Sequence, residues 1–176
     1  PDEGSVHYDG LDFHSLDRNG QRALRQQIGM LFQSSALFDS LTVAENVRFP
    51  IDMFRRWTKA EAQARVNECL EQVDLSGKND LLVSELSGGM KKRVGIARAI
   101  VLQPKYLFFD EPNSGLDPKT AERIDALIQD LTHRLGTTTV VITHDMKSVL
   151  QIADQILFIF EGRKEWAGSR EAIRQA

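Results

Sequence analysis

The 176-residue sequence has a single cysteine, Cys69, and no long run of apolar residues. One thiol cannot form a disulfide within the chain, and scarcity of cysteine is typical of proteins from a reducing compartment, so we expect a cytosolic location. No stretch approaches the roughly 18 apolar residues that a membrane-spanning helix needs, and no signal peptide is visible. We therefore expect any membrane association to be peripheral.

The sequence also lacks an excess of one charge. Its 22 Lys and Arg residues nearly balance 25 Asp and Glu residues, which leaves a net charge of −3. This balance argues against nucleic acid as a partner. A hydrophobic content of 41% in a chain of this length is enough for one substantial core with a subdomain.

The chain is organised around residues 105–117. Residues 106–109 are apolar and predict a strand buried on both faces of a parallel sheet. The strand stops at Asp110 and Glu111, and Pro112 then directs the chain out of the sheet. Ligands bind at the carboxyl ends of such strands, so one acid could hold a metal ion and the other could deprotonate a water. A strand end capped by solvated acids explains the motif alone equally well.

Other segments carry local signals for strands and helices. Alternation over residues 4–13, with Asp9-Gly10 as a turn, predicts a hairpin. Two capping-box patterns, at residues 42–45 and 58–61, each predict the start of a helix. Further strands are expected over residues 28–32, 137–143, 155–160 and 163–167, and further helices over residues 20–25, 118–135 and 146–153. Their alternation predicts a parallel α/β sheet.

Polar side chains follow three of these strands. They are Gln33, the Asp110-Glu111 pair and His144. Because the carboxyl ends of parallel strands share one edge of a sheet, we expect these side chains to converge. A lone histidine after a strand is usually a surface residue, but three such endings are hard to assign to chance.

A helix start lies between the first two of these strand ends. Ser87 is a good N-cap, and Gly88 and Gly89 leave the first amides of the helix uncovered. Bare amides at a helix N-terminus form an anion site. An ordinary capped helix is the competing interpretation.

In sequence order, these motifs resemble those of the ATP-binding-cassette (ABC) ATPases. The Q-loop corresponds to Gln33, the signature to residues 86–90, Walker B to residues 107–112, the D-loop to residues 114–117, and the switch histidine to His144. The resemblance covers the whole chain, and its one departure is Met90, where the family usually has Gln. It implies an α/β fold of the P-loop NTPase type, with a parallel sheet core and a helical subdomain.

The resemblance also implies roles in hydrolysis of ATP. Asp110 would hold the waters of Mg²⁺, and Glu111 would act as the general base on the attacking water. His144 would hold the γ-phosphate and the water in line. Gln33 would sense the metal and the γ-phosphate and would signal to a partner.

Further implied roles lie across a homodimer. Ser87, Gly88 and Gly89 would bind the γ-phosphate of ATP on a second ATPase subunit, and Asp117 would couple the two sites.

The phosphate-binding pattern Gly-x-x-x-x-Gly-Lys-Ser/Thr (Walker A) does not occur in the sequence. In the family it precedes the segment that residues 1–10 resemble. We therefore expect an N-terminally truncated chain that lacks the first strands and is inactive alone, although its parent is an ATPase. The alternative is that the N-terminal part is present in the protein and is only omitted from this sequence. The expected division is residues 1–34 (core with the Q-loop), 35–103 (helical subdomain with the signature) and 104–176 (remaining core). The strand over residues 137–143 should have an unpaired edge.

Residues 33–50, with Ser-Ala-Leu-Phe after the Q-loop, and Met90 resemble Mla-type ATPases of phospholipid transport. This branch implies a transmembrane permease partner docked on residues 36–54, and a location at the cytoplasmic face of the inner membrane. Three alternatives stay open: an ATPase of an amino-acid importer, a soluble ABC protein without a transport role, and a non-hydrolytic interaction module.

Overall fold

The computed structural model describes residues 3–173, so the outer ends of the expected segments 1–34 and 104–176 lie outside the described residues. Among residues 3–173, no helix combines the length and the apolarity of a membrane span. The elements in chain order are β1 (His7–Tyr8), β2 (Leu11–Asp12), η1 (Phe13–Ser15), α1 (Arg18–Arg25), β3 (Ile28–Leu31), α2 (Val43–Phe54), α3 (Lys59–Gln72), η2 (Val83–Glu85), α4 (Gly88–Ile100), β4 (Tyr106–Asp110), α5 (Pro118–Leu135), β5 (Thr138–Ile142), α6 (Met146–Ile152), β6 (Gln155–Phe160), β7 (Arg163–Ser169) and α7 (Arg170–Ile173).

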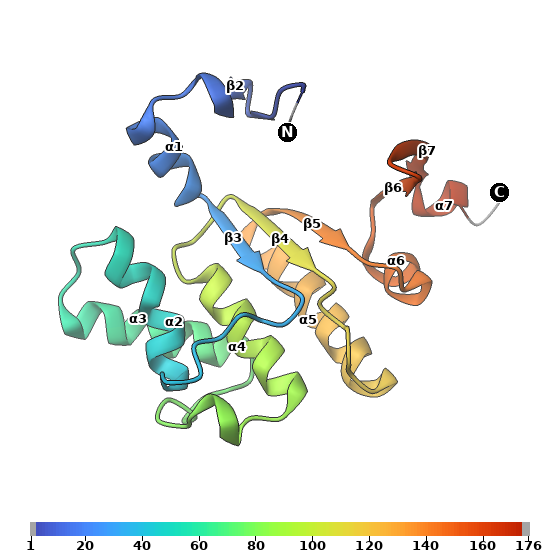
Figure 1. Ribbon diagram of the computed structural model, residues 1–176. Coiled ribbons are helices and arrows are strands. Elements are labelled where there is room, and N and C mark those ends of the chain that lie inside the picture. The colour runs from blue at the N-terminus through green and yellow to red at the C-terminus, as the bar shows by residue number, and fades with distance from the viewer. Residues whose placement is uncertain (1–2, 174–176) are drawn as a thin grey trace.

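The central sheet consists of β3, β4 and β5, in that order and all parallel (Figure 1). Leu31 lies opposite Phe109, and Asp110 lies opposite Ile142. The predicted parallel sheet is therefore confirmed for these three strands, and their carboxyl ends lie side by side.

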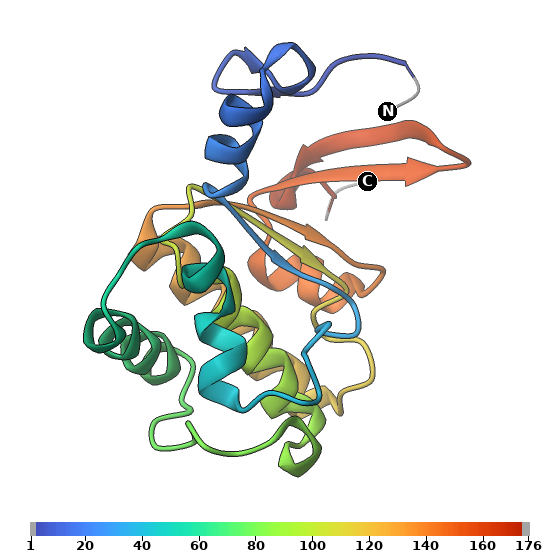
Figure 2. The same ribbon diagram turned by 60° about the vertical axis from the view of Figure 1, so that its left-hand side comes forward.

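Only one face of this sheet is well covered. Leu31, Leu107 and Phe109 are fully buried in one core with residues of α4 and α5, and Figure 2 shows these helices on the same side of the sheet. On the opposite face, Val140 and Ile142 are 42% and 54% exposed. In β4 itself, Tyr106 and Phe108 on this face are only half-buried, so the prediction that residues 106–109 are buried on both faces is wrong for the described chain.

Two glycines allow α4 to lie very close to β3. A Cβ atom at Gly29 would lie 2.2 Å from the carbonyl oxygen of Ala99, and one at Gly95 would lie 2.5 Å from Leu31 Cδ1. Since real side chains do not tolerate such distances, the lack of a side chain at both positions permits this helix–strand contact.

The helix ends follow the predicted local signals. Thr42 and Glu45 form a reciprocal capping box at α2, and the predicted box at α3 is also present. Asp117 caps α5 ahead of Pro118, and Gly136, with a φ of 60°, ends that helix.

The last two strands depart from the expected parallel sheet. β6 and β7 pair antiparallel with each other as a separate two-stranded sheet, which Figure 2 shows set apart from β5. Glu161 and Gly162 have φ values of 47° and 74°, so they form a tight two-residue turn. Such a turn can connect only antiparallel strands, because parallel strands need a long crossover.

Candidate functional site

The three strand ends converge as predicted. Asp110 ends β4 and is paired with Ile142 at the end of β5. Glu111 follows directly, and its backbone N–H donates to the carbonyl of Ile142 at 2.9 Å. His144 lies two residues beyond β5 on the same edge.

Glu111 and His144 are in direct contact. Nδ1 of His144 lies 2.7 Å from Oε1 of Glu111. The Glu111 side chain is 18% exposed, whereas the His144 side chain is 85% exposed. The hydrogen bond to Glu111, together with the charge of this carboxylate, raises the pKa of His144. The pair therefore joins a largely shielded carboxylate to a solvent-facing imidazole in which the protonated form is favoured.

The backbone of Glu111 is held in an unusual conformation. Its φ of 46° lies in the left-handed region, which costs an L-residue about 1–2 kcal/mol. Its carbonyl accepts hydrogen bonds from Ser114 N at 3.2 Å and from Lys92 Nζ at 2.9 Å. Lys92 also donates to the carbonyl of Gln33 at 2.5 Å. This buried lysine was not recognised from the sequence.

Asp110 and Gln33 offer oxygen atoms at the same edge. Asp110 is half-buried, Gln33 is exposed, and neither side chain has a hydrogen-bond partner among residues 3–173. Within the described chain no group of three or more His, Cys, Asp or Glu side chains could enclose a metal ion. A single carboxylate and an amide oxygen fit Mg²⁺, which keeps several waters and takes its other ligands from substrate phosphates.

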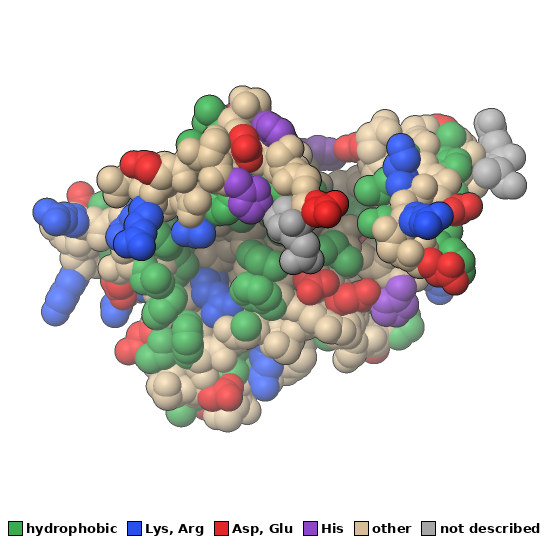
Figure 3. Space-filling view, turned by 45° about the horizontal axis from the view of Figure 1, so that its top comes forward, with side chains coloured by type: hydrophobic (Ala, Val, Ile, Leu, Met, Phe, Trp, Pro, Cys, Tyr) green, Lys and Arg blue, Asp and Glu red, His purple; other side chains and the backbone are tan. Residues whose placement is uncertain are grey.

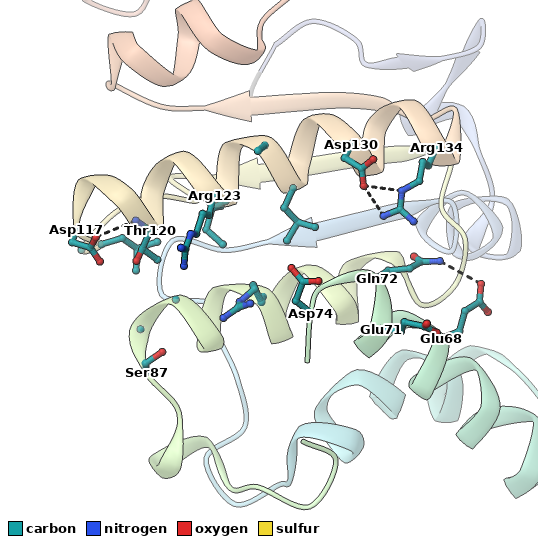
Figure 4. Close-up of a pocket in the computed structure, with 18 residues that line it drawn as sticks. Glu68, Glu71, Gln72, Asp74, Ser87, Asp117, Thr120, Arg123, Asp130 and Arg134 are labelled. Carbon is teal, nitrogen blue, oxygen red and sulfur yellow. Dashed lines mark hydrogen bonds and ion pairs between the residues drawn. The ribbon is translucent and has the colours of Figure 1, made fainter. Parts of the chain in front are cut away.

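The signature residues lie in a second place, a cleft of about 1030 Å³ lined by α3, α4 and α5 (Figure 4). Ser87 caps α4, with its Oγ accepting from Met90 N at 3.3 Å, so the predicted N-cap is confirmed. A Cβ at Gly89 would lie 2.7 Å from Cγ2 of Thr120, so packing against α5 also requires a glycine there. Gly88 lines the same cleft beside Leu116.

Asp117 lies at the start of α5 in this cleft, near Thr120 (Figure 4). Its carboxylate accepts from Thr120 N at 3.1 Å, and hydrogen bonds to Thr120 lower its pKa. Further along α5, the exposed side chain of Arg134 pairs with Asp130 at 2.7 Å, while Arg123 points into the space between the helices (Figure 4). The cleft is therefore polar and carries charges of both signs.

A buried polar cluster connects the segment after Glu111 with α5 and α6. Asn113 donates to Asp125 at 2.7 Å and to Ser148 at 3.0 Å, and Ser148 donates to Asp125 at 2.7 Å. Burial raises the pKa of Asp125. Sequence reasoning missed this cluster, although an aspartate on the apolar stripe of α5, between Ile124 and Ile128, was a usable signal.

Comparison with known proteins decides the family. A family model described as ABC transporter matches residues 1–114. The chain belongs to this family. The ATP-binding cassette MJ0796, solved as a dimer in a post-hydrolysis state with ADP and Pi, superposes with a TM-score of 0.84 at 32% identity, covering 96% of this chain and 74% of its own. The expected ABC ATPase fold is confirmed.

Two relatives within the ABC transporter family are methionine import ATP-binding proteins MetN. The protein from Brucella abortus is 43% identical over 92% of this chain and 44% of its own length. The one from Caulobacter vibrioides is 44% identical over 98% of this chain and 52% of its own length. The chain thus spans about half the length of these relatives.

These relatives do not support the predicted Mla-type branch. The residues used for that prediction have structural roles. The carbonyls of Ser35 and Ala36 accept hydrogen bonds from Arg98, Phe38 packs on Phe49, and Met90 packs against the core. In this structure these residues therefore make contacts within the cassette itself.

Proposed function

We propose that the whole protein to which this chain belongs hydrolyses ATP, with Glu111 and His144 acting on the attacking water. The observation that carries the proposal is the 2.7 Å contact between these two side chains at neighbouring strand ends. Water attacks the γ-phosphorus, the bond to the β-phosphate oxygen breaks, and ADP and phosphate form. Glu111 accepts the proton of the water. His144, which faces solvent beside Glu111, can form a hydrogen bond to a phosphate oxygen.

Asp110 and Gln33 are the proposed holders of Mg²⁺. Their oxygens at the edge of the sheet fit an ion that keeps much of its water shell. When bound, Mg²⁺ neutralises charge on the phosphates.

A second ATPase subunit completes the proposed site. Ser87, Gly88 and Gly89 present the N-terminus of α4, where amides and the helix dipole favour a phosphate. In this proposal they bind the γ-phosphate held mainly by the partner subunit, and Asp117, in the same cleft, couples the two sites. The dimeric state of the cassette MJ0796 with ADP and Pi supports this arrangement.

The proposed transport process is import of an amino acid, with methionine as the first candidate. Two relatives above 40% identity carry the name methionine import ATP-binding protein. We therefore prefer amino-acid import, one of the alternatives left open by the sequence, to phospholipid transport as the process that this ATPase drives.

An apolar groove between α1, β3, α2 and α4 is the proposed contact with a transmembrane permease. It has a volume of about 440 Å³, and its lining includes Met30, Phe32, Phe49 and Met53. Hydrophobic side chains gather next to basic ones on this side of the molecule (Figure 3). A permease helix docked here would hold the protein peripherally at the cytoplasmic face of the membrane. The division into residues 1–34, 35–103 and 104–176 also stays a proposal.

Substitution of the proposed base tests the function. In the whole protein, Glu111→Gln should lower kcat at least about 100-fold, because the amide cannot accept the proton, and should leave ATP binding intact. Glu122→Gln is the matched control, since Glu122 is an exposed glutamate on α5. Turnover of Glu111→Gln within a few-fold of the wild type would exclude Glu111 as the base. That the isolated 176 residues bind no nucleotide stays a prediction, which calorimetric titration with Mg-ATP tests.

A further inference from the structure

Lys92 is a buried cation whose presence the packing of α4 does not require. The residue is 5% exposed, and although the charges of Glu111 and Asp110 attract its ammonium group, no carboxylate among residues 3–173 forms an ion pair with it. Burial of an ammonium group is costly unless specific contacts compensate it. Its contacts are two main-chain carbonyls, those of Gln33 and Glu111.

The helix is already fastened to the sheet by other contacts. The close approach at Gly29 and Gly95 holds α4 against β3, and Val94, Ile96, Ala97 and Ile100 of α4 are buried in the surrounding core. Arg98 adds hydrogen bonds to two further carbonyls. An apolar residue at position 92 could fill the same space without the free-energy cost of burying a charged group.

The two carbonyls that Lys92 binds belong to the residues at which the site is built. Gln33 follows β3 and Glu111 follows β4, and these strands are parallel neighbours. One ammonium group on α4 therefore connects the ends of two adjacent strands, across sequence separations of 59 and 19 residues.

The contact at Glu111 acts on a strained residue. With a φ of 46°, Glu111 keeps its conformation only while its surroundings enforce it. The amide is held by Ile142 and the carbonyl by Ser114 and Lys92. The Lys92 contact is therefore one of three hydrogen bonds that hold the Glu111 backbone in the conformation that points its carboxylate at His144.

We propose that Lys92 is a positioning residue that aims the Glu111 carboxylate by holding its main-chain carbonyl. Lys92 touches no reacting atom in this role. It acts through Glu111, and it makes the direction of that side chain depend on where α4 lies against the sheet. The catalytic consequence rests on the function proposed above, whereas the contact itself does not.

The test compares Lys92→Met with Lys91→Met in the whole protein, with folding checked by circular dichroism. Lys91 is the adjacent lysine of α4; it is half-buried, and its side chain forms no hydrogen bond among the described residues. We expect Lys92→Met to lower kcat about 100-fold with the KM for ATP within about two-fold, because a displaced catalytic group costs turnover more than binding. Lys91→Met should behave as the wild type, and Lys92→Arg, which keeps a charged donor, should recover most of the loss.

A second readout does not depend on activity. The ¹⁵N signal of His144 Nδ1, measured at one pH without nucleotide, reports the contact with Glu111, and Glu111→Ala defines its position when the contact is lost. We expect Lys92→Met to move the signal most of the way to that position and Lys91→Met to leave it unchanged.

Each combination of results decides the proposal. An unmoved signal in Lys92→Met overturns it, whatever happens to kcat. A moved signal with unchanged kcat supports the positioning contact and instead removes Glu111 from the proposed reaction. If Lys92→Met does not fold, the same two readouts are taken from Lys92→Gln, which is uncharged and too short to hold both carbonyls.

Discussion

Two apolar regions of this molecule differ sharply in how they are buried. The helices α2, α3 and α4 share one core with β3 and β4, in which Val66, Leu70 and Phe109 have no exposed surface. In β6, by contrast, Leu157 and Ile159 are 57% and 60% exposed. Both regions have the apolar patterns expected of their elements. The difference teaches that a pattern forms a helix or strand locally, whereas burial requires a second layer to pack against it.

The second layer is present for only one of the two regions in the described chain. α4 and α5 cover the inner face of β3 and β4. β5 pairs with β4 on one side and with no other described strand on its second side, so the expected unpaired edge is present in residues 3–173. Apolar side chains stay exposed on β5 and on the β6–β7 hairpin, as they do in the groove between α1, β3, α2 and α4.

The largest expected effect is a difference in the free energy of unfolding between a phenylalanine substitution in the buried core and one in β6. Phe109→Ala should lower the free energy of unfolding by about 3–5 kcal/mol, because a fully buried side chain leaves a cavity. Phe160→Ala removes a ring that is 57% exposed and should cost less than about 0.5 kcal/mol. Urea unfolding of both variants measures the contrast. Equal losses would show that β6 is buried in solution.

A smaller effect is expected on the pH dependence of the free energy of unfolding, and it comes from Asp125. This aspartate is 2% exposed at the border of the well-packed region. Burial raises its pKa, so the folded protein keeps this proton to a higher pH than the unfolded chain does. Its contribution to the free energy of unfolding is therefore complete below the unfolded pKa and is lost as the pH rises through the folded pKa, with a slope of at most about 1.4 kcal/mol per pH unit.

Asp125→Asn should abolish this slope, and urea unfolding between pH 3.5 and 7 measures it. The control, Asp39→Asn, changes an exposed aspartate and should retain the wild-type slope. A slope that persists in Asp125→Asn would assign the pH dependence to other carboxylates.

The smallest effect on stability is expected at the open edge and hairpin. Val140→Lys and Ile159→Lys place a charge on side chains that are 42% and 60% exposed, so unfolding should change by less than about 0.5 kcal/mol. Self-association should nevertheless fall, since charged residues block edge-to-edge pairing of strands. Light scattering of the two variants against wild type measures this, and an unchanged particle size would exclude the edge as a contact.

The sequence predicted those parts of the fold and of the candidate site that depend on near neighbours. The capping boxes at Thr42 and Thr58 join atoms three residues apart, and the turn at Asp9-Gly10 needs only two positive φ values. The convergence of Glu111 and His144 was also predictable, because parallel strands carry their ends to one edge. The antiparallel course of β6 and β7 was missed, although the two-residue turn between them is a local signal.

Only the tertiary structure decided which polar residues become buried around that edge. Lys92 reaches Gln33 and Glu111, and Asp125 reaches Ser148, across separations of 59, 19 and 23 residues. Side chains at such separations meet only after helices have packed on a sheet. The residues next to each of these side chains therefore do not indicate which distant residue it will contact. For the same reason the open face of β5 was not foreseen, since covering a face depends on where other elements lie, whereas forming a strand depends on the alternation of its own residues.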